Sequence, residues 1–103
     1  MAHPSKNKGN RFERLIVNIT KDEGIEAKRA YASDGRALGC HEEVDVLIDG
    51  KIKVQCKTRK KIANWMMPSE HVDIQVIKED RGIPYVVIPY DDYLELIKET
   101  KVK

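Results

Sequence analysis

The sequence has only two cysteines, Cys40 and Cys56, and no long run of apolar residues. Two thiols in a reducing compartment stay unpaired, so we expect no disulfide. A membrane-spanning helix needs roughly 20 mostly apolar residues, and no stretch of the chain supplies them. Residues 1–10 are polar and basic, whereas a secretory signal has an apolar centre. These absences predict a cytoplasmic, intracellular protein with no membrane partner.

Two kinds of site also lack the residues that they need. Cys40, His41 and Cys56 offer fewer ligands than a structural zinc site uses, and none has a CxxC or HxxxH spacing. No nucleophilic triad is apparent. The chain of 103 residues holds no internal repeat and no linker, which predicts one domain. We expect a basic arm over residues 1–9 and a single domain over residues 10–103.

Positive charge is concentrated in the first part of the chain. Residues 1–61 hold 14 lysines and arginines against 9 acidic residues, whereas residues 62–103 hold 5 against 8. Basic surfaces bind nucleic acids because they displace counterions from the phosphates. A basic face also serves solubility alone, so the charge by itself leaves both interpretations open.

Hydrophobic periodicity predicts a mixed α/β chain of the α+β kind. Apolar residues spaced i, i+3, i+4 and i+7 from Phe12 to Ile19 indicate an amphipathic helix over about residues 10–22. Alternation over residues 25–32 indicates a strand, and residues 33–41 resemble a polar loop.

The second half of the chain adds three expected elements. Ser69 is expected to cap a helix that runs to about Glu79. A short apolar strand is expected over residues 84–89, and Asp91 is expected to open a closing helix. With a hairpin between the two halves, the predicted order of elements is αβββαβα.

The dipeptide Asp49-Gly50 lies between two β-branched runs, residues 44–48 and 52–57, and indicates that hairpin. A two-residue loop would mix polar and apolar side chains on both faces. A three-residue loop, Ile48-Asp49-Gly50, with a type I turn and a left-handed Gly50, pairs Asp45 with Lys53 instead. The longer loop is expected because it gives one apolar face of Val44, Val46, Ile52, Val54 and Cys56. The opposite face then holds Asp45, Lys53, Gln55 and Lys57.

The residues of this polar face suit phosphodiester hydrolysis. That reaction uses a metal ion, oxygen ligands that hold it, and a cation beside the attacking water. Asp45 offers a carboxylate, Gln55 an amide oxygen, and Lys57 the cation. Cys56 would add its backbone carbonyl to the metal ligands. Glu13, on the first helix, would complete the set if that helix packs nearby.

Several short motifs resemble those of the PD-(D/E)XK nuclease superfamily. They are Gly9–Arg14, Arg29 with Ser33, Val44-Asp45-Val46 and Gln55-Cys56-Lys57, over roughly residues 8–61. They look like the glutamate of the first helix and the split (P)D…(D/E)XK motif, and are most similar to archaeal-type Holliday junction resolvases. The resemblance implies a restriction-endonuclease-like αβββαβ core, with a mixed central sheet flanked by helices, plus a C-terminal helix.

The same resemblance implies a Mg²⁺- or Mn²⁺-dependent DNA endonuclease of microbial or viral origin that acts in DNA repair and recombination. Glu13, Asp45 and the residue-55 oxygen would serve the metal, and Lys57 would orient the nucleophile. Ser33 would lie near the scissile phosphate. The resemblance also implies a homodimer that cuts two strands of branched or duplex DNA.

The chain departs from the motif at Gln55, where an aspartate or glutamate is usual, so the site has one negative charge fewer. Either Glu42 or Glu43 would restore it if the preceding loop folds back. A second hypothesis follows from the same residue: a catalytically inactive, nuclease-fold DNA-binding or regulatory module. Val44 replaces the usual proline, which contributes backbone shape only.

Basic residues near these motifs are candidates for DNA contact, because phosphate contacts position a duplex. The candidates are Lys8, Arg11, Arg14, Arg29, Arg59, Lys60 and Lys61. Arg29 serves equally as a structural contact, and the others as solvated surface. The apolar run Trp65-Met66-Met67 is open to three interpretations: core, dimer interface or DNA contact.

Overall fold

The computed structural model describes residues 4–102, and the side chains of residues 7–32 and 34–100. The chain divides after Thr58 into two compact units. Two long helices and two small antiparallel sheets make up the regular structure, so the expected α+β class is confirmed. No helix among the described residues is long and apolar enough to cross a membrane.

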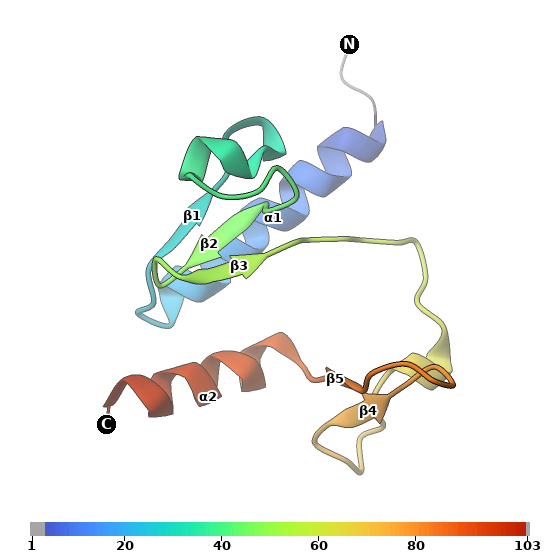
Figure 1. Ribbon diagram of the computed structural model, residues 1–103. Coiled ribbons are helices and arrows are strands. Elements are labelled where there is room, and N and C mark those ends of the chain that lie inside the picture. The colour runs from blue at the N-terminus through green and yellow to red at the C-terminus, as the bar shows by residue number, and fades with distance from the viewer. Residues whose placement is uncertain (1–3, 103) are drawn as a thin grey trace. The chain divides into compact units, whose positions relative to one another are not determined.

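The first unit is one helix packed on a three-stranded sheet (Figure 1). Its elements are helix α1 (Pro4–Asp22) and strands β1 (Ala27–Arg29), β2 (Val46–Ile48) and β3 (Ile52–Val54), in sheet order β1-β2-β3. The apolar stripe of α1 buries Ile16 and Val17, and the sheet buries Ala27, Val46 and Ile48. Burial of these side chains is the main favourable term for the unit.

Helix α1 begins at Pro4, six residues before the expected start, and ends at Asp22, as its periodicity predicted. Gly24 terminates it in the left-handed conformation, with φ of 79°, and its amide donates to the Lys21 carbonyl at 2.9 Å. The chain then turns directly into β1. This short connection places the middle of α1 over the strands.

The β2–β3 hairpin has a three-residue loop, Asp49-Gly50-Lys51, and pairs Val46 with Val54 and Ile48 with Ile52. The expected pairing of Asp45 with Lys53 is wrong, since Lys53 pairs with Leu47. Ile48 is fully buried and stays in the strand, so Lys51 becomes the third loop residue in its place.

The turn type also differs from the expectation. Asp49 and Gly50 both have positive φ, 55° and 69°, whereas a type I turn would leave Asp49 right-handed. The amide of Lys51 closes the turn by donating to the Ile48 carbonyl at 3.1 Å. A two-residue turn would have shifted β3 by one residue and so turned its apolar side chains to the opposite face of the sheet. Because Lys51 adds a third loop residue, the apolar side chains of β3 stay on the same face as those of β2.

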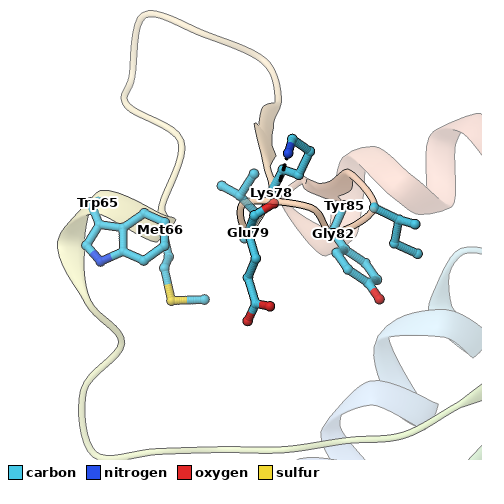
Figure 2. Close-up of a pocket in the computed structure, with 8 residues that line it drawn as sticks. Trp65, Met66, Lys78, Glu79, Gly82 and Tyr85 are labelled. Carbon is cyan, nitrogen blue, oxygen red and sulfur yellow. Dashed lines mark hydrogen bonds between the residues drawn. The ribbon is translucent and has the colours of Figure 1, made fainter.

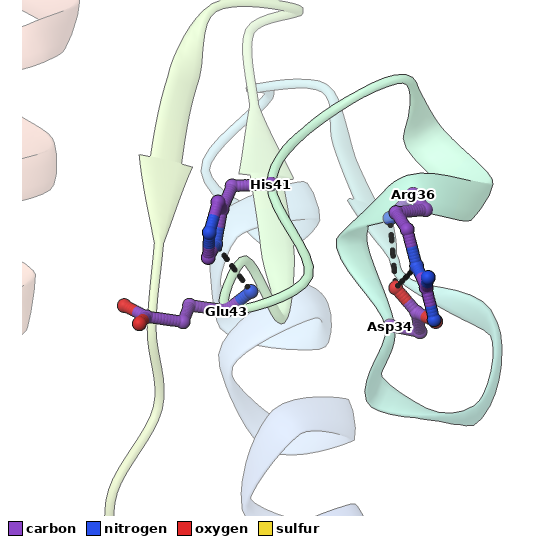
Figure 3. A network of polar contacts seen from close by, with 4 residues as sticks. All are labelled: Asp34, Arg36, His41 and Glu43. Atoms are coloured by element: carbon purple, nitrogen blue, oxygen red, sulfur yellow. Dashed lines mark hydrogen bonds and ion pairs between the residues drawn. The ribbon is translucent and has the colours of Figure 1, made fainter.

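The expected loop between β1 and β2 is folded into two 3-10 turns, Tyr31–Ser33 and Gly35–Leu38. Asp34 caps the second turn, because its carboxylate accepts from the Arg36 amide at 3.0 Å. The Arg36 guanidinium also bonds that carboxylate, which lowers the pKa of Asp34. This side-chain pair lies at the surface of the first unit (Figure 3).

The second unit contains a two-stranded antiparallel sheet and a helix. A 3-10 turn (Asn64–Met66) precedes β4 (Gln75–Ile77) and β5 (Tyr85–Val87), and helix α2 spans Tyr90–Val102. The closing helix and the last strand are confirmed. Leu94 and Ile97 of α2 are buried.

The helix predicted from Ser69 to Glu79 is wrong, because strand β4 occupies its second half. Ser69 does bond the amide of His71, at 3.2 Å, but it caps a single turn and no helix follows. The β-branched pair Val76 and Ile77 instead meets a partner strand, and this nonlocal pairing outweighs the weak helical pattern.

The expected mixed central sheet is also wrong for the described residues, whose two sheets are both antiparallel. A mixed sheet needs a strand from the second half of the chain beside the β1-β2-β3 sheet. β5 pairs with β4 instead, because the segment between them turns back through Arg81, which has φ of 65°, and Gly82.

The second unit has a hollow of about 370 Å³ between its 3-10 turn and the β4–β5 hairpin (Figure 2). Trp65 and Met66 line one side, and Gly82 and Tyr85 are among the residues on the other. Trp65 remains 68% exposed, so it is not part of a core within the second unit. Apolar side chains are exposed elsewhere on the same hairpin, at Val76, Ile83 and Val86.

Candidate functional site

Asp45 lies at an irregularity in the β2–β3 pairing. Its amide donates to the carbonyl of Val54 at 2.8 Å, although Val54 is the partner of Val46. Two residues of one strand thus face a single residue of the other, as in a β-bulge. A bulge re-aims the side chains at its own position, so Asp45 departs from the simple alternation expected from the sequence and is buried like its neighbours Val44 and Val46.

The redirected carboxylate of Asp45 is buried, with 9% of the residue exposed. Its Oδ2 accepts a hydrogen bond of 2.8 Å from the backbone amide of Cys56. A charged acceptor makes this bond stronger than one between neutral groups. The bond fixes Asp45 against the segment Gln55-Cys56-Lys57, so Asp45 lies beside three other expected site positions.

The pKa of the Cys56 thiol depends on burial and on the charges around it. Burial raises its pKa to about 11, and the negative charges of Asp45 and then Glu13 act in the same direction. Cys56 is therefore a neutral thiol near pH 7. Because both carboxylates act on one sulfur, Glu13 of α1 lies within electrostatic reach of the same place as Asp45.

Glu13 is buried, with 5% exposed, and forms an ion pair with Arg29 of β1 at 3.6 Å between Oε1 and Nε. A buried charge needs such a partner, and removal of one member of a buried pair costs about 3–5 kcal/mol. Of the two roles expected for Arg29, the structural one is therefore present. Arg29 also neutralises one of the two buried carboxylates of the site.

Gln55 and Lys57 follow β3 and are exposed, on either side of Cys56. Gln55 lines a surface hollow with residues from the loop before β2, namely His41, Glu43 and Val44, and with Lys53 and Val54. The loop thus folds back toward the position of the missing carboxylate. Of the two glutamates considered, Glu43 lines this hollow and Glu42 is not part of its lining.

The expected DNA-contacting residues fall into two groups. Arg11 and Arg14 line a hollow on α1 together with Asn7 and Asn10, and Lys8 is exposed on the same helix. The second group, Arg59, Lys60 and Lys61, is exposed in an irregular segment that begins the second unit. The side chain of Ser33 lies outside the described residues.

The donor set consists of oxygen atoms, which suits a hard divalent cation such as Mg²⁺ or Mn²⁺. Glu13 and Asp45 supply buried carboxylates, and Gln55 an amide oxygen. Among the described residues, no group of three or more histidine, cysteine, aspartate or glutamate side chains is arranged to hold a metal ion. The set fits only if the glutamine oxygen or a backbone carbonyl contributes.

One family of known proteins matches the chain. The sequence profile of the archaeal Holliday junction resolvase (Hjc) family matches residues 4–101, which include both units. Searches among curated proteins and among solved structures found no match. The profile covers nearly the whole chain and contains every candidate residue named above. The chain therefore belongs to the archaeal Holliday junction resolvase family.

Proposed function

We propose that the protein is a Mg²⁺- or Mn²⁺-dependent endonuclease that hydrolyses phosphodiester bonds in branched DNA. Membership of a Holliday junction resolvase family implies nuclease action on DNA. The observation that carries the metal-dependent mechanism is the buried Asp45 carboxylate, bonded to the Cys56 amide beside Gln55 and Lys57. No salt bridge joins Asp45 to a lysine or arginine whose side chain the structure describes, and a carboxylate held out of solvent in this way is a suitable ligand for a cation.

The proposed chemistry uses few residues. Asp45 and Gln55, with Glu13 and the Cys56 carbonyl nearby, would hold the cation, which supplies charge neutralisation at the phosphate and activation of water. The ammonium group of Lys57 orients the attacking water. The water oxygen bonds to phosphorus and loses a proton to solvent, the bond to the leaving sugar oxygen breaks, and that oxygen takes up a proton from solvent. Ser33 is proposed to contact the scissile phosphate.

Binding of DNA is assigned to the two basic groups, Lys8, Arg11 and Arg14 on α1, and Arg59, Lys60 and Lys61 after β3. Each supplies exposed positive charge to phosphates. Because the family profile spans both units, we propose that both serve one nuclease domain. A homodimer would place two such sites on one junction, and sedimentation equilibrium would test that assembly.

A panel of cleavage assays tests this function. Four-way junctions, nicked duplexes, intact duplexes and single strands are incubated with Mg²⁺ or Mn²⁺ and either the wild-type protein or Lys57→Ala. Cleavage that favours branched DNA and disappears in Lys57→Ala is expected. Lys51→Ala is the matched control, since Lys51 is an exposed lysine in the hairpin turn. Equal cleavage by the wild type and Lys57→Ala would contradict the proposed role of Lys57.

The alternative function is a nuclease-fold module that binds DNA and does not cut it. Gln55 favours it, together with the lack of a cluster of three acidic or imidazole ligands among the described residues. This module would retain salt-dependent junction binding and show no metal-dependent cleavage of any substrate in the panel.

A further inference from the structure

Tyr31 presents an aromatic ring to solvent just after strand β1. With 83% of the residue exposed, it is the most exposed of the large apolar and aromatic residues that the structure describes. It begins the 3-10 turn Tyr31–Ser33. No hydrogen bond or ring contact joins its side chain to another described side chain. The ring is therefore available to a ligand.

The backbone places Tyr31 close to Asp45. The amide of the preceding residue, Ala30, donates to the Asp45 carbonyl at 2.8 Å and continues the β1–β2 pairing by one step. Opposite residues in such a pair have Cα atoms roughly 5 Å apart, and consecutive Cα atoms are about 3.8 Å apart. The Cα atoms of Tyr31 and Asp45 thus lie within about 10 Å of each other. Because bases along one strand are spaced by about 3.4 Å, a base that touches Tyr31 is only a few nucleotides from a phosphate bound at Asp45.

The turn holds the Tyr31 backbone on both sides. Ala30 is fully buried, and the Tyr31 carbonyl accepts from the Asp34 amide at 3.0 Å. Asp34 is itself held by its bonds to Arg36 (Figure 3). Between them Ala32 has φ of 52° and ψ of 30°, a left-handed conformation that alanine rarely adopts. Such strain is found most often at binding and catalytic sites, and here it fixes the turn that carries the ring.

The surroundings of Tyr31 favour a nucleic-acid base over a protein partner. A protein interface needs a contiguous apolar patch, and the turn after Tyr31 offers only Ala32, Ser33, Asp34 and Arg36 before it continues. A single ring is enough for a base, because every base has a π-face on which an aromatic side chain stacks. In an intact duplex both faces of each base are covered by its neighbours, whereas a branch point leaves faces uncovered.

We propose that Tyr31 stacks on an uncovered base at the branch point and thereby makes the protein select branched DNA over intact duplex. Stacking tolerates any base, so the contact selects the structure of the DNA and not its sequence. Tyr31 lies outside the motifs that resemble the PD-(D/E)XK nucleases. The contact rests on the proposed nuclease function and adds a specificity-determining residue to it.

The first test measures DNA affinity by fluorescence anisotropy, with Ca²⁺ in place of Mg²⁺. Tyr31→Ala should weaken binding of a four-way junction about tenfold, as for the loss of one stacked base. Binding of an intact duplex should stay within about twofold of the wild type, since the phosphate contacts remain. The exposed ring contributes little to folding, so urea unfolding should be unchanged. Equal losses on both DNAs, or no loss on the junction, overturn the inference.

Two further variants at the same position isolate the aromatic face. Tyr31→Phe keeps the ring and should bind the junction as the wild type does. Tyr31→Leu is apolar and of similar size but lacks a π-face, so it should bind as weakly as Tyr31→Ala. A weak Tyr31→Phe would assign the contact to the hydroxyl group, and a wild-type Tyr31→Leu would assign it to apolar packing. Either result overturns the inference, as does weaker self-association of DNA-free Tyr31→Ala in sedimentation equilibrium.

A direct test uses junctions in which 5-iodouracil replaces one thymine at a time within about four nucleotides of the branch point. Long-wavelength ultraviolet light couples this base, with loss of hydrogen iodide, to an aromatic ring that stacks on it. The expected product is a DNA-linked peptide that contains Tyr31, formed with the junction and not with the intact duplex. Absence of this peptide at every position, or equal yield from the duplex, overturns the inference.

Cleavage of the same junction with Mg²⁺ separates this inference from the proposed function. A wild type that binds the junction through Tyr31 but cuts no DNA removes the nuclease function and leaves the stacking contact standing. A wild type that cuts the junction, matched by Tyr31→Ala in both affinity and rate, leaves the function standing and removes the contact. A wild type that binds no DNA overturns both.

Discussion

The carboxylate of Asp45 accepts a hydrogen bond of 2.8 Å from the backbone amide of Cys56 and so joins strand β2 to the segment after β3. The bond is possible because the bulge at Asp45 turns its side chain away from the alternation of the strand. Asp45 is consequently both a fixed structural group and a buried charge. These two properties are separable by mutation.

Asp45→Asn keeps an oxygen that accepts from the Cys56 amide and removes the charge. We expect junction cleavage to fall by about 100-fold or more, since the lost charge stabilises the cation. The free energy of unfolding should be equal or slightly higher, because Asp45 and Glu13 no longer repel each other. Single-turnover cleavage and urea unfolding measure the two effects.

Asp49→Asn is the control for this variant, because asparagine tolerates the left-handed conformation that Asp49 adopts in the turn. A loss of stability in Asp45→Asn matching that of Asp45→Ala would show that charge, and not the hydrogen bond alone, holds the hairpin.

The Cys56 thiol should react slowly with iodoacetamide at pH 8, because a group with a pKa of about 11 is almost entirely protonated there. The rate should rise as the pH increases toward about 11 and the thiolate forms. The measurement uses the Cys40→Ser background, with EDTA present to remove metal ions.

Adding Asp45→Asn to this background should lower the Cys56 pKa and speed alkylation near pH 9, since a neighbouring negative charge is removed. If Asp45→Asn left the pH dependence of the alkylation rate unchanged, the charge of Asp45 would not affect the pKa of Cys56.

Gly50→Ala and Gly9→Ala should change the free energy of unfolding in opposite directions. Neither added Cβ would meet another atom within 4 Å, so the backbone alone decides the outcome. Gly50 has φ of 69°, and alanine there should cost about 1 kcal/mol. Gly9 lies in α1, where alanine should stabilise by up to about 1 kcal/mol. Urea unfolding of both variants gives the signs, and a stabilising Gly50→Ala would refute the left-handed turn.

The salt dependence of junction binding should identify the side chains that neutralise phosphates. In the variant with Arg59, Lys60 and Lys61 all changed to alanine, the slope of log affinity against log salt should become shallower. The change should be about 0.9 for each phosphate that these side chains neutralise in the wild type. Fluorescence anisotropy with a labelled junction and Ca²⁺ in place of Mg²⁺ measures binding without cleavage. An unchanged slope would mean that this segment is only a solvated surface.

The sequence predicts features that depend on near neighbours. The stripe from Phe12 to Ile19 predicts α1, and Asp49-Gly50 predicts a hairpin. Both signals are local, because a helix face and a tight turn are specified within a few residues. The order of Glu13, Asp45, Gln55 and Lys57 likewise suffices to predict the family that the profile match confirms.

Other features depend on which strands pair with each other and in which register. The pattern over residues 69–79 is compatible with a helix, and only the presence of β5 decides that Gln75–Ile77 forms a strand. The bulge at Asp45 and the place of Glu43 in the Gln55 hollow also require the three-dimensional register. Sequence periodicity alone does not specify such pairings.

In the three-residue loop Asp49-Gly50-Lys51, the length of the loop matters more than the identity of its residues. Deletion of one loop residue, even the exposed Lys51, would slide β3 by one position against β2. Ile52 and Val54 would then point to solvent, and Lys53 toward α1. Among related genes, substitutions in this turn should therefore be common, whereas single-codon insertions and deletions should be rare unless a second, compensating length change occurs nearby.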